Sequence, residues 1–456
     1  MISFSLSETA EMLGGCLHGA DVRFASVSTD SRTISNGDLF VALQGPNFDG
    51  HDWLDQVLVK GAVGAMVSRD VVSALPRLQV TDTRQGLGAL AACWREASLV
   101  NLVAVTGSNG KTTVKEMIAA ILSRQGQTLA TIGNLNNDIG LPLTLLRLQD
   151  ESYAVVEMGA GGPGEIEYLS GIARPDVAIL NNAGAAHLEG FGSPEGVARA
   201  KAEIVSGLAP GGTFIFNADE PWADLWHELA GDHPVRTFGM QAQADVTSSG
   251  SEVETRWDES GFLSHFQVCT PEGDLAIKLP LAGSHNQMNA LAAIAATQLM
   301  GASLEQICDG LASMQPVKGR LQPRAGANGV RLIDDSYNAN PDSVAAAIAV
   351  LATAPGCRFM VLGDLAELGE DSENLHEMLG RKVREAGIEQ LYCLSDASCA
   401  TARGFGVGAM LFREQDALIA ALQENLSAGD SVLIKGSRSA GMEQVVCALL
   451  DSDGHC

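Results

Sequence analysis

Residues 103–113 read Val-Ala-Val-Thr-Gly-Ser-Asn-Gly-Lys-Thr-Thr, an apolar run that leads into a glycine-rich turn. A strand, a glycine-rich turn and a helix can together wrap a polyphosphate, because the first-turn amides of the helix point at the anion. In such a loop Lys111 reaches the outer phosphates, and the hydroxyl of Thr112 ligates the accompanying magnesium ion. The stretch therefore predicts a phosphate loop of the short form Thr-Gly-x-x-Gly-Lys-Thr. Its candidate nucleotide-binding residues are Thr106, Gly107, Ser108, Asn109, Gly110, Lys111, Thr112 and Thr113.

The composition is that of an ordinary globular protein, with 46% hydrophobic and 18% charged residues. A chain of 456 residues is too long for one core, so we expect about two to four domains. No apolar run reaches the length of a membrane span, and the first residues lack the pattern of a signal peptide, which predicts a cytoplasmic protein. The nine cysteines form no C-x-x-C pair and are expected to be reduced thiols.

The net charge of −26 disfavours binding to nucleic acid or to an anionic membrane surface. An anionic nucleotide must therefore meet positive charge that is arranged locally, by helix N-termini, by Lys and Arg side chains, or by metal ions. We expect no nucleic-acid partner and no membrane insertion. The sequence does not give the oligomeric state, and a monomer is the expectation.

Three segments differ in pattern, and they predict domains at 1–82, 83–314 and 315–456. The first has short strands and polar loops, whereas the other two alternate strands and helices, which predicts parallel sheets covered by helices. In the central segment we expect strands at 102–105, 153–157, 176–181 and 213–216, helices at 112–124, 194–208 and 285–299, and additional antiparallel strands between 240 and 280. In the last segment we expect strands at 330–334, 358–362, 390–394 and 431–434, and helices at 341–353, 372–386, 415–425 and 440–451.

Polar side chains follow two of the predicted central strands. Glu157 ends a buried strand on the rim that carries the phosphate loop, where it can hold magnesium or simply face solvent. His187 lies just beyond the next strand, as a metal ligand or as an ordinary loop residue. Lys201 lies on a predicted helix, and its position alone does not single it out.

Amide-rich loops are the next candidates. Asn136 and Asn137 belong to a polar loop suited to hydrogen bonding a sugar or a peptide. Asn286 opens an alanine-rich helix, where it can contact a base or cap the helix. In the last segment polar side chains flank several predicted strands, as ligand-binding residues do in parallel sheets. Arg320 precedes the first of these strands, Tyr337, Asn338 and Asn340 follow it, and Lys435 and Arg438 follow a later strand.

Together these motifs resemble those of the ATP-dependent Mur ligases of peptidoglycan synthesis, and the resemblance covers the whole chain. The phosphate loop, Glu157, the 181–187 stretch, Lys201, Asn286 and Arg320 stand in the family's order. Within the family, the chain is most similar to the branch that joins D-alanyl-D-alanine to UDP-N-acetylmuramoyl-tripeptide. The motifs that carry this finer resemblance are Ser28–Arg32, Gly37–Leu43, Phe48–His51, Gly133–Pro142, Asp335–Pro341, Gly363–Gly369 and Lys435–Arg438.

The resemblance implies an α/β protein of three domains. A small N-terminal domain would bind the uridine diphosphate of the substrate, a central domain with a mostly parallel sheet would bind ATP, and the C-terminal domain would be Rossmann-like. The residues expected to hold the nucleotide-sugar are Ser31, Arg32, Asn47, Asp49 and His51. Asn286 and Arg320 would contact ATP, and Tyr337, Asn338 and Asn340 would lie near the dipeptide. One of Lys435 and Arg438 would meet the dipeptide carboxylate.

The implied chemistry is amide formation through an acyl phosphate, with ATP and Mg²⁺. Lys111, Lys201 and His187 are the expected catalytic residues, and the expected metal ligands are Thr112, Glu157, His187 and a carbamylated Lys201. Two neighbours in the family are alternatives. The ligase that adds diaminopimelate usually has an Asn-Pro-Arg turn, whereas this chain has Asn340-Pro341-Asp342. Folylpolyglutamate synthase lacks the nucleotide-sugar domain. A binding protein that has lost turnover is a further alternative, which the intact set of site residues disfavours.

Overall fold

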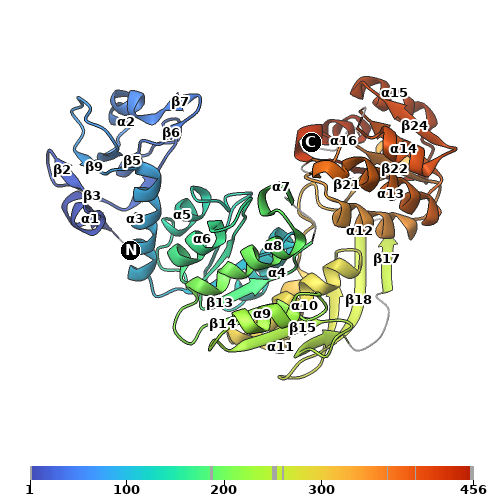
Figure 1. Cartoon of the computed structure of the whole chain (residues 1–456), viewed down its shortest axis with the longest axis horizontal. Helices are drawn as coiled ribbons and strands as arrows, with labels where there is room; N and C mark the ends of the chain where they lie inside the picture. Colours follow the sequence, from blue (N-terminus) through green and yellow to red (C-terminus); the bar gives the residue numbers. More distant parts are fainter. Residues whose placement is uncertain are drawn as a thin grey trace.

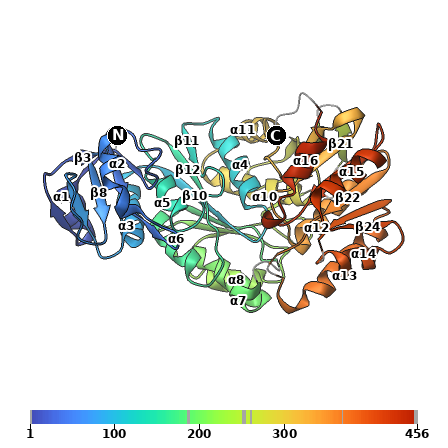
Figure 2. The same ribbon diagram turned by 90° about the horizontal axis from the view of Figure 1, so that it is seen from above.

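The computed structural model describes residues 3–184, 188–248, 254–258, 261–366, 368–395 and 397–451. The chain forms three α/β domains, and the N-terminal and C-terminal domains stand on opposite sides of the central one (Figures 1 and 2). Each domain is built on its own main sheet.

The N-terminal domain has a five-stranded sheet in the order β2-β9-β8-β5-β4. These strands are β2 (Cys16–His18), β9 (Arg77–Gln79), β8 (Gly64–Val67), β5 (Asp38–Val41) and β4 (Ser26–Ser28). Two small pairs accompany it, β1 (Phe4–Ser5) with β3 (Arg23–Phe24), and β6 (Gln44–Gly45) with β7 (Phe48–Asp49). Its helices are α1 (Leu6–Leu13), the 3₁₀ helix η1 (Gly50–Trp53) and α2 (Leu54–Val59).

Helix α3 (Thr83–Ala97) joins this domain to the central one. Asp82 caps its N-terminus by accepting from the backbone N–H groups of Arg84 and Gln85. Near its other end Trp94 is fully buried, stacks on Phe24 of the N-terminal domain, and donates to the carbonyl of Leu148 in the central domain. One apolar helix face therefore packs on both domains.

The central sheet has the order β11-β12-β10-β13-β14-β15-β16-β18-β17, with β19 paired to β18. Neighbours from β11 to β16 are parallel, and β17 to β19 continue the sheet in antiparallel pairs. The strands are β10 (Asn101–Thr106), β11 (Thr128–Ala130), β12 (Tyr153–Glu157), β13 (Val177–Leu180), β14 (Thr213–Asn217), β15 (Val235–Gly239), β16 (Val246–Ser248), β17 (Glu254–Asp258), β18 (Gly261–Cys269) and β19 (Leu275–Leu279).

Helices cover both faces of this sheet. They are α4 (Lys111–Leu122), α5 (Gly140–Leu145), α6 (Glu165–Ala173), α7 (Leu188–Phe191), α8 (Pro194–Ala202), η2 (Glu203–Gly207), α9 (Ala223–Leu229), α10 (Ser284–Leu299) and α11 (Leu304–Ala312). Successive residues of β10 point to opposite faces, so Val103 and Val105 enter the core under α4 and α10, whereas Leu102 and Ala104 enter the core under α3 and α6. This burial on both faces explains why the strand is apolar throughout.

The C-terminal sheet has the order β20-β21-β25-β22-β23-β24, and it is parallel except for the edge strand β20. Its strands are β20 (Gln322–Ala325), β21 (Arg331–Asp335), β22 (Arg358–Leu362), β23 (Gln390–Leu394), β24 (Ala409–Phe412) and β25 (Ser431–Lys435). Its helices are η3 (Ala327–Gly329), α12 (Pro341–Ala352), η4 (Gly369–Asp371), α13 (Ser372–Glu385), α14 (Cys399–Phe405), α15 (Gln415–Asn425), η5 (Arg438–Ala440) and α16 (Glu443–Leu449).

The predicted fold class is confirmed, and the expected strands lie within a residue or two of the observed ones. Two helix predictions are too long, because 194–208 divides into α8 and η2, and 440–451 contains only the shorter α16. The domain boundaries at 82 and 314 stay predictions. Within the described part of the chain seven cysteines are free, but Cys447 is disulfide-bonded, so the expectation of reduced thiols is wrong for that residue. Over the described ranges, no helix is both long enough and apolar enough to cross a bilayer.

Candidate active site

The phosphate loop connects the end of β10 to the start of α4. Gly110 has a φ of +79°, and a Cβ there would collide with the side chains of Asn181 and Asn289. Only glycine fits this position, because the left-handed conformation and the lack of space both exclude a side chain. Gly110 also offers no side-chain acceptor to the first amides of α4. These amides are thus free to bind an anion at the positive end of a twelve-residue helix.

Lys111 is folded back over this loop. Its Nζ donates to the carbonyl of Gly107 at 2.6 Å and to that of Ser108 at 3.3 Å. Burial lowers the pKa of Lys111, and the nearby carboxylate of Glu157 partly offsets that effect. The ammonium is consequently held next to the helix N-terminus at which phosphates would lie.

Thr112 and Glu157 meet at the same end of the sheet. The hydroxyl of Thr112 donates to Oε2 of Glu157 at 2.8 Å, and Nδ2 of Asn136 donates to Oε1 at 2.8 Å. The carboxylate is thereby fixed in position although its residue is only 3% exposed. A hydroxyl and a carboxylate beside a phosphate loop are the oxygen ligands that Mg²⁺ takes. The described residues contain no cluster of three or more His, Cys, Asp or Glu side chains that could hold a metal ion.

Lys201 lies on α8 and lines the same cleft, although its residue is only 2% exposed. Burial, with a smaller contribution from the charge of Lys111, lowers the pKa of Lys201 to about 7. Its Nζ lies 5.5 Å from the centre of the Phe191 ring. This amine therefore gives up its proton more readily than an exposed lysine does, and a neutral amine is nucleophilic. The predicted ligand His187 lies outside the described residues.

Asparagine side chains surround the back of the loop. Asn182 accepts from the backbone N–H of Asn109 and donates to its carbonyl, while Asn181 donates to that carbonyl and to Asn289. Asn286 accepts from Asn289 and donates to the carbonyl of Ala282, so it holds the first turn of α10. A contact between Asn286 and ATP stays a prediction.

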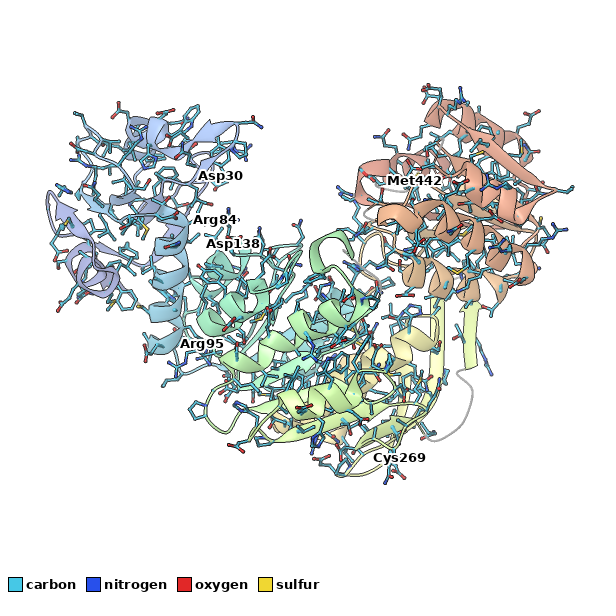
Figure 3. All side chains as sticks on the ribbon, in the orientation of Figure 1. Asp30, Arg84, Arg95, Asp138, Cys269 and Met442 are labelled. Atoms are coloured by element: carbon cyan, nitrogen blue, oxygen red, sulfur yellow. The ribbon has the colours of Figure 1, made fainter. Side chains whose placement is uncertain are left out.

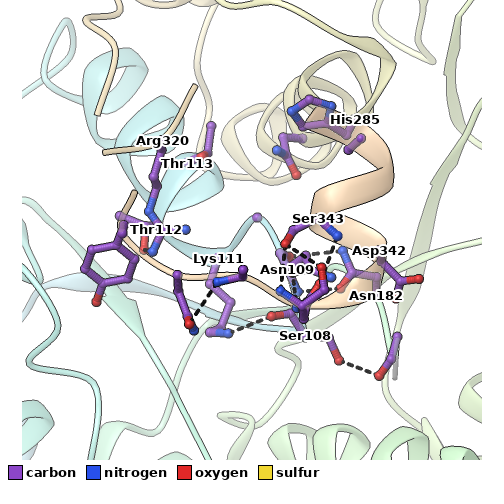
Figure 4. Close-up of a pocket in the computed structure, with 18 of the residues that line it drawn as sticks. Ser108, Asn109, Lys111, Thr112, Thr113, Asn182, His285, Arg320, Asp342 and Ser343 are labelled. Atoms are coloured by element: carbon purple, nitrogen blue, oxygen red, sulfur yellow. Dashed lines mark hydrogen bonds between the residues drawn. The ribbon is translucent and has the colours of Figure 1, made fainter. Parts of the chain in front are cut away.

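The C-terminal domain reaches the loop through two side chains. Arg320 donates to the hydroxyl of Thr112 at 3.1 Å, and its guanidinium stacks 4.4 Å from the centre of the Tyr337 ring. Asn340 donates to Oδ1 of Asn109 at 2.7 Å while it caps α12. Residues of both domains thus line one cleft of about 1100 Å³ (Figure 4). Asn338 and Arg438 also line it.

Lys435 is bonded to residues of its own domain. Its Nζ bonds Oδ2 of Asp335 at 2.6 Å and the carbonyl of Asn338 at 2.9 Å, and the side chain is 3% exposed. The Arg438 side chain is 66% exposed, forms a 3.5 Å ion pair with Glu443, and has its guanidinium 6.0 Å from the centre of the Tyr337 ring. Of the two candidates for the dipeptide carboxylate, Arg438 is the accessible one.

The residues predicted to hold the nucleotide-sugar lie in the N-terminal domain, away from this cleft. Arg32 pairs with Asp30, which holds the pKa of that carboxyl at about 2, and Lys60 donates to the carbonyls of Ser31 and Arg32. His51 is buried, with Nδ1 2.6 Å from Asp49 and Nε2 accepting from the backbone N–H of Ser68. His51 is therefore bonded inside the N-terminal domain, where it orients Asp49 and the backbone at Ser68. Asn47 is exposed.

Asn137 lies between these two regions. Its Oδ1 accepts from the N–H of Gly140 at the start of α5. Beside it Arg84 and Asp138 form an ion pair where the N-terminal and central domains meet (Figure 3). A second, smaller cavity is lined by this pair, by Asn137 and by Tyr168. It neighbours the main cleft, since Asn137, Gly159 and Glu165 line both.

Three parts of the chain match domains of one family. Residues 23–95 match the Mur ligase family catalytic domain, residues 105–297 the Mur ligase middle domain, and residues 319–438 the Mur ligase glutamate ligase domain. The UDP-N-acetylmuramoyl-tripeptide–D-alanyl-D-alanine ligase of Escherichia coli K12 is 46% identical over 461 residues, which cover 100% of both chains. The chain belongs to the Mur ligase family.

Solved structures agree with this Mur ligase assignment. MurF from Acinetobacter baumannii is 38% identical and superposes with a TM-score of 0.91 over 98% of both chains. MurF ligase from Thermotoga maritima, solved in complex with ADP, is 30% identical and has a TM-score of 0.83 over 93% of this chain and 96% of that one. The predicted family and its three-domain α/β fold are therefore confirmed.

Several residues of this Mur ligase site had no signal in the sequence. His285 lines the cleft, and burial together with the charge of Lys435 lowers its pKa to about 4, so the ring is neutral. Glu220 lines it as well, and burial raises the pKa of its carboxyl. Neither belongs to a spacing pattern. Asp335 differs from these two, because it follows a predicted strand and opens the Asp335–Pro341 motif.

Proposed function

We propose that this Mur ligase joins D-alanyl-D-alanine to UDP-N-acetylmuramoyl-tripeptide at the expense of ATP, in the synthesis of a peptidoglycan precursor. The observation that carries the proposal is the end-to-end match, at 46% identity, to a ligase with that name. A phosphate loop and a Thr–Glu pair in the cleft between two domains support it, because this chemistry needs them together.

ATP would bind with its phosphates on the amides of α4, near Lys111 and Arg320. Thr112 and Glu157 would hold Mg²⁺, which supplies positive charge that stabilises the phosphate oxygens when it is bound. Arg320 contacts Thr112 from the other domain, so its positive charge would lie beside the bound phosphates.

The proposed reaction has two steps. A carboxylate oxygen of the tripeptide attacks the γ-phosphorus of ATP, the bond to the β–γ bridging oxygen breaks, and an acyl phosphate and ADP form. The amine of D-alanyl-D-alanine then attacks the acyl carbon. The tetrahedral intermediate loses inorganic phosphate, the amine gives up a proton, and an amide results. Lys111 and Arg320 stabilise the charge on the phosphoryl oxygens in both steps.

Lys201 would supply a further metal ligand. Its buried neutral amine can add to CO₂ and release a proton to solvent, which forms a carbamate and places an anion on the wall of the cleft. The pKa of about 7 supports this reaction because it provides the neutral amine. The oxygens of the carbamate suit Mg²⁺.

The two ends of the substrate pair would occupy opposite domains. The exposed loops of the N-terminal domain around Arg32 and Asn47 would hold the uridine diphosphate, with the peptide running past Asn137 to the main cleft. Arg438 would meet the carboxylate of the dipeptide, since Lys435 is buried against Asp335. We further propose that the protein acts as a cytoplasmic monomer.

The test is release of phosphate from Mg·ATP in the presence of UDP-N-acetylmuramoyl-tripeptide, with and without D-alanyl-D-alanine. Release that requires the dipeptide supports the proposal. Release that instead requires UDP-N-acetylmuramoyl-dipeptide and a diamino acid would move the chain to the neighbouring ligase. Absence of release under both conditions would leave a Mur ligase fold that binds nucleotide without turnover.

A further inference from the structure

The segment that links the central and C-terminal domains has a left-handed residue on each side of Arg320. Gly319 has a φ of +70°, and a Cβ there would lie 3.2 Å from the backbone N of Tyr337. Leu321 has a φ of +45°, which is uncommon for a residue with a branched side chain. The Leu321 side chain is buried in the C-terminal core. Such a conformation persists only where the surroundings hold it.

A buried ion pair holds this segment. Oδ1 of Asp335 accepts from the backbone N–H of Leu321 at 3.1 Å, and Oδ2 of the same carboxylate accepts from Nζ of Lys435 at 2.6 Å. Asp335 and Lys435 face each other on the parallel strands β21 and β25. Their side chains are 10% and 3% exposed, so solvent screens the pair little.

The held segment presents Arg320 to the phosphate loop. Arg320 lies between the two left-handed residues, and its guanidinium donates to the hydroxyl of Thr112 in the central domain. The second bond of Lys435 goes to the carbonyl of Asn338, two residues before the Asn340 that contacts Asn109. The ammonium of Lys435 therefore supports both contacts that cross from the C-terminal domain to the loop.

We propose that Lys435 is a positioning residue for the nucleotide. It fixes the carboxylate of Asp335, which fixes the backbone at Leu321, and so it aims the guanidinium of Arg320 at the phosphate loop. Lys435 does not contact the dipeptide. This inference rests on the proposed function only in requiring that the cleft binds Mg·ATP.

The experiment measures the affinity for a non-hydrolysable ATP analogue with Mg²⁺ by calorimetry, using the full chain. The variants are Lys435→Met, Arg320→Ala and the two combined, with the exposed Lys382→Met as the matched control. Lys435→Met is expected to weaken binding about tenfold, which is within the range seen for residues that act through others. When Arg320 is already replaced by Ala, Lys435→Met is expected to weaken binding of the analogue less than about twofold. Lys435 acts through Arg320, so its effect should be lost when Arg320 is absent.

The steady-state constants supply the readout that a purely structural role would not move. KM for ATP rises in Lys435→Met, whereas KM for D-alanyl-D-alanine stays near that of the unaltered protein. If Lys435→Met does not fold, it is replaced by the double variant Lys435→Met with Asp335→Asn, which leaves no unpaired charge buried. The affinity of this double variant for the analogue is expected to be weakened as well.

Two results would overturn this inference and leave the proposed function standing. One is that the losses of binding free energy of Lys435→Met and Arg320→Ala add fully in the double variant. The other is that Lys435→Met raises KM for D-alanyl-D-alanine and not KM for ATP. Failure of the unaltered protein to bind the analogue is a different result. It would refute the proposed function, and the inference with it, before any variant is compared.

Discussion

Replacing Lys201 by Met is expected to stabilise the protein while it removes activity, and to do so by an amount that depends on pH. Burial lowers the pKa of Lys201 from 10.5 to about 7 in the folded protein. Between these two values the unfolded chain binds a proton that the folded chain has released. Stability of the unaltered protein therefore rises with pH across this window, and the buried amine costs most at its lower end.

The size of the effect follows from the two pKa values. Linkage gives a cost of about 4 kcal/mol at pH 7 and about 2 kcal/mol at pH 9 for burying this amine. Lys201→Met removes the titrating group, so its other effects on stability do not change with pH. The advantage of the variant over the unaltered protein should thus shrink by about 2 kcal/mol from pH 7 to pH 9.

Urea unfolding of the two proteins in CO₂-free buffer, followed by tryptophan fluorescence, measures this difference. Trp226 reports on the relevant domain because it is fully buried and donates to the carbonyl of Ala198 on α8. CO₂ is excluded because a carbamate would remove the titrating amine. The exposed Lys382→Met is the control and should show no dependence on pH. A stability difference for Lys201→Met that stays within about 0.5 kcal/mol over this range would refute the reasoning.

Three further predictions concern the loop and its partners. Lys111→Ala should abolish phosphate release without changing the circular dichroism spectrum, since the side chain bonds only carbonyls of its own loop among the described residues; release at a near-normal rate would exclude the phosphate-loop assignment. Glu157→Gln should lower turnover at least about a hundredfold and raise the Mg²⁺ concentration that gives half the maximal rate, and an unchanged metal requirement would contradict its role as a ligand. Asn340→Ala should lower the stability of the C-terminal domain by about 1 kcal/mol through loss of the cap on α12 and raise KM for ATP. Asn340→Asp keeps the cap but cannot donate to Asn109, so it should raise KM for ATP without lowering stability. An unchanged KM for ATP in this variant would show that the contact with Asn109 is not needed.

The fold could be predicted from the sequence because the patterns that specify its strands and turns are local. Strands such as Tyr153–Glu157 are apolar on both faces and end in a polar residue. That pattern predicts a parallel strand with a site residue at its carboxyl end. The glycines of the phosphate loop are equally readable, because a left-handed turn beside crowded side chains admits no other residue.

The parts that could not be predicted depend on contacts between distant residues. Asn109 and Asn340 are 231 positions apart, and Asp335 and Lys435 are 100 apart, so no local spacing relates them. Lys201 looks like any surface lysine of a helix, and only the packing of the cleft shows that it is buried. The left-handed Leu321 has no signature at all, since leucine favours other conformations.

The central claim is that amide formation passes through an acyl phosphate of the tripeptide. It is tested most directly with UDP-N-acetylmuramoyl-tripeptide whose reactive carboxylate carries ¹⁸O in both oxygens, incubated with Mg·ATP and D-alanyl-D-alanine. Attack by that carboxylate on the γ-phosphorus predicts that the released phosphate carries one ¹⁸O atom and that the amide product forms in equal amount. Unlabelled phosphate would mean that water attacks ATP instead, and it would contradict the account.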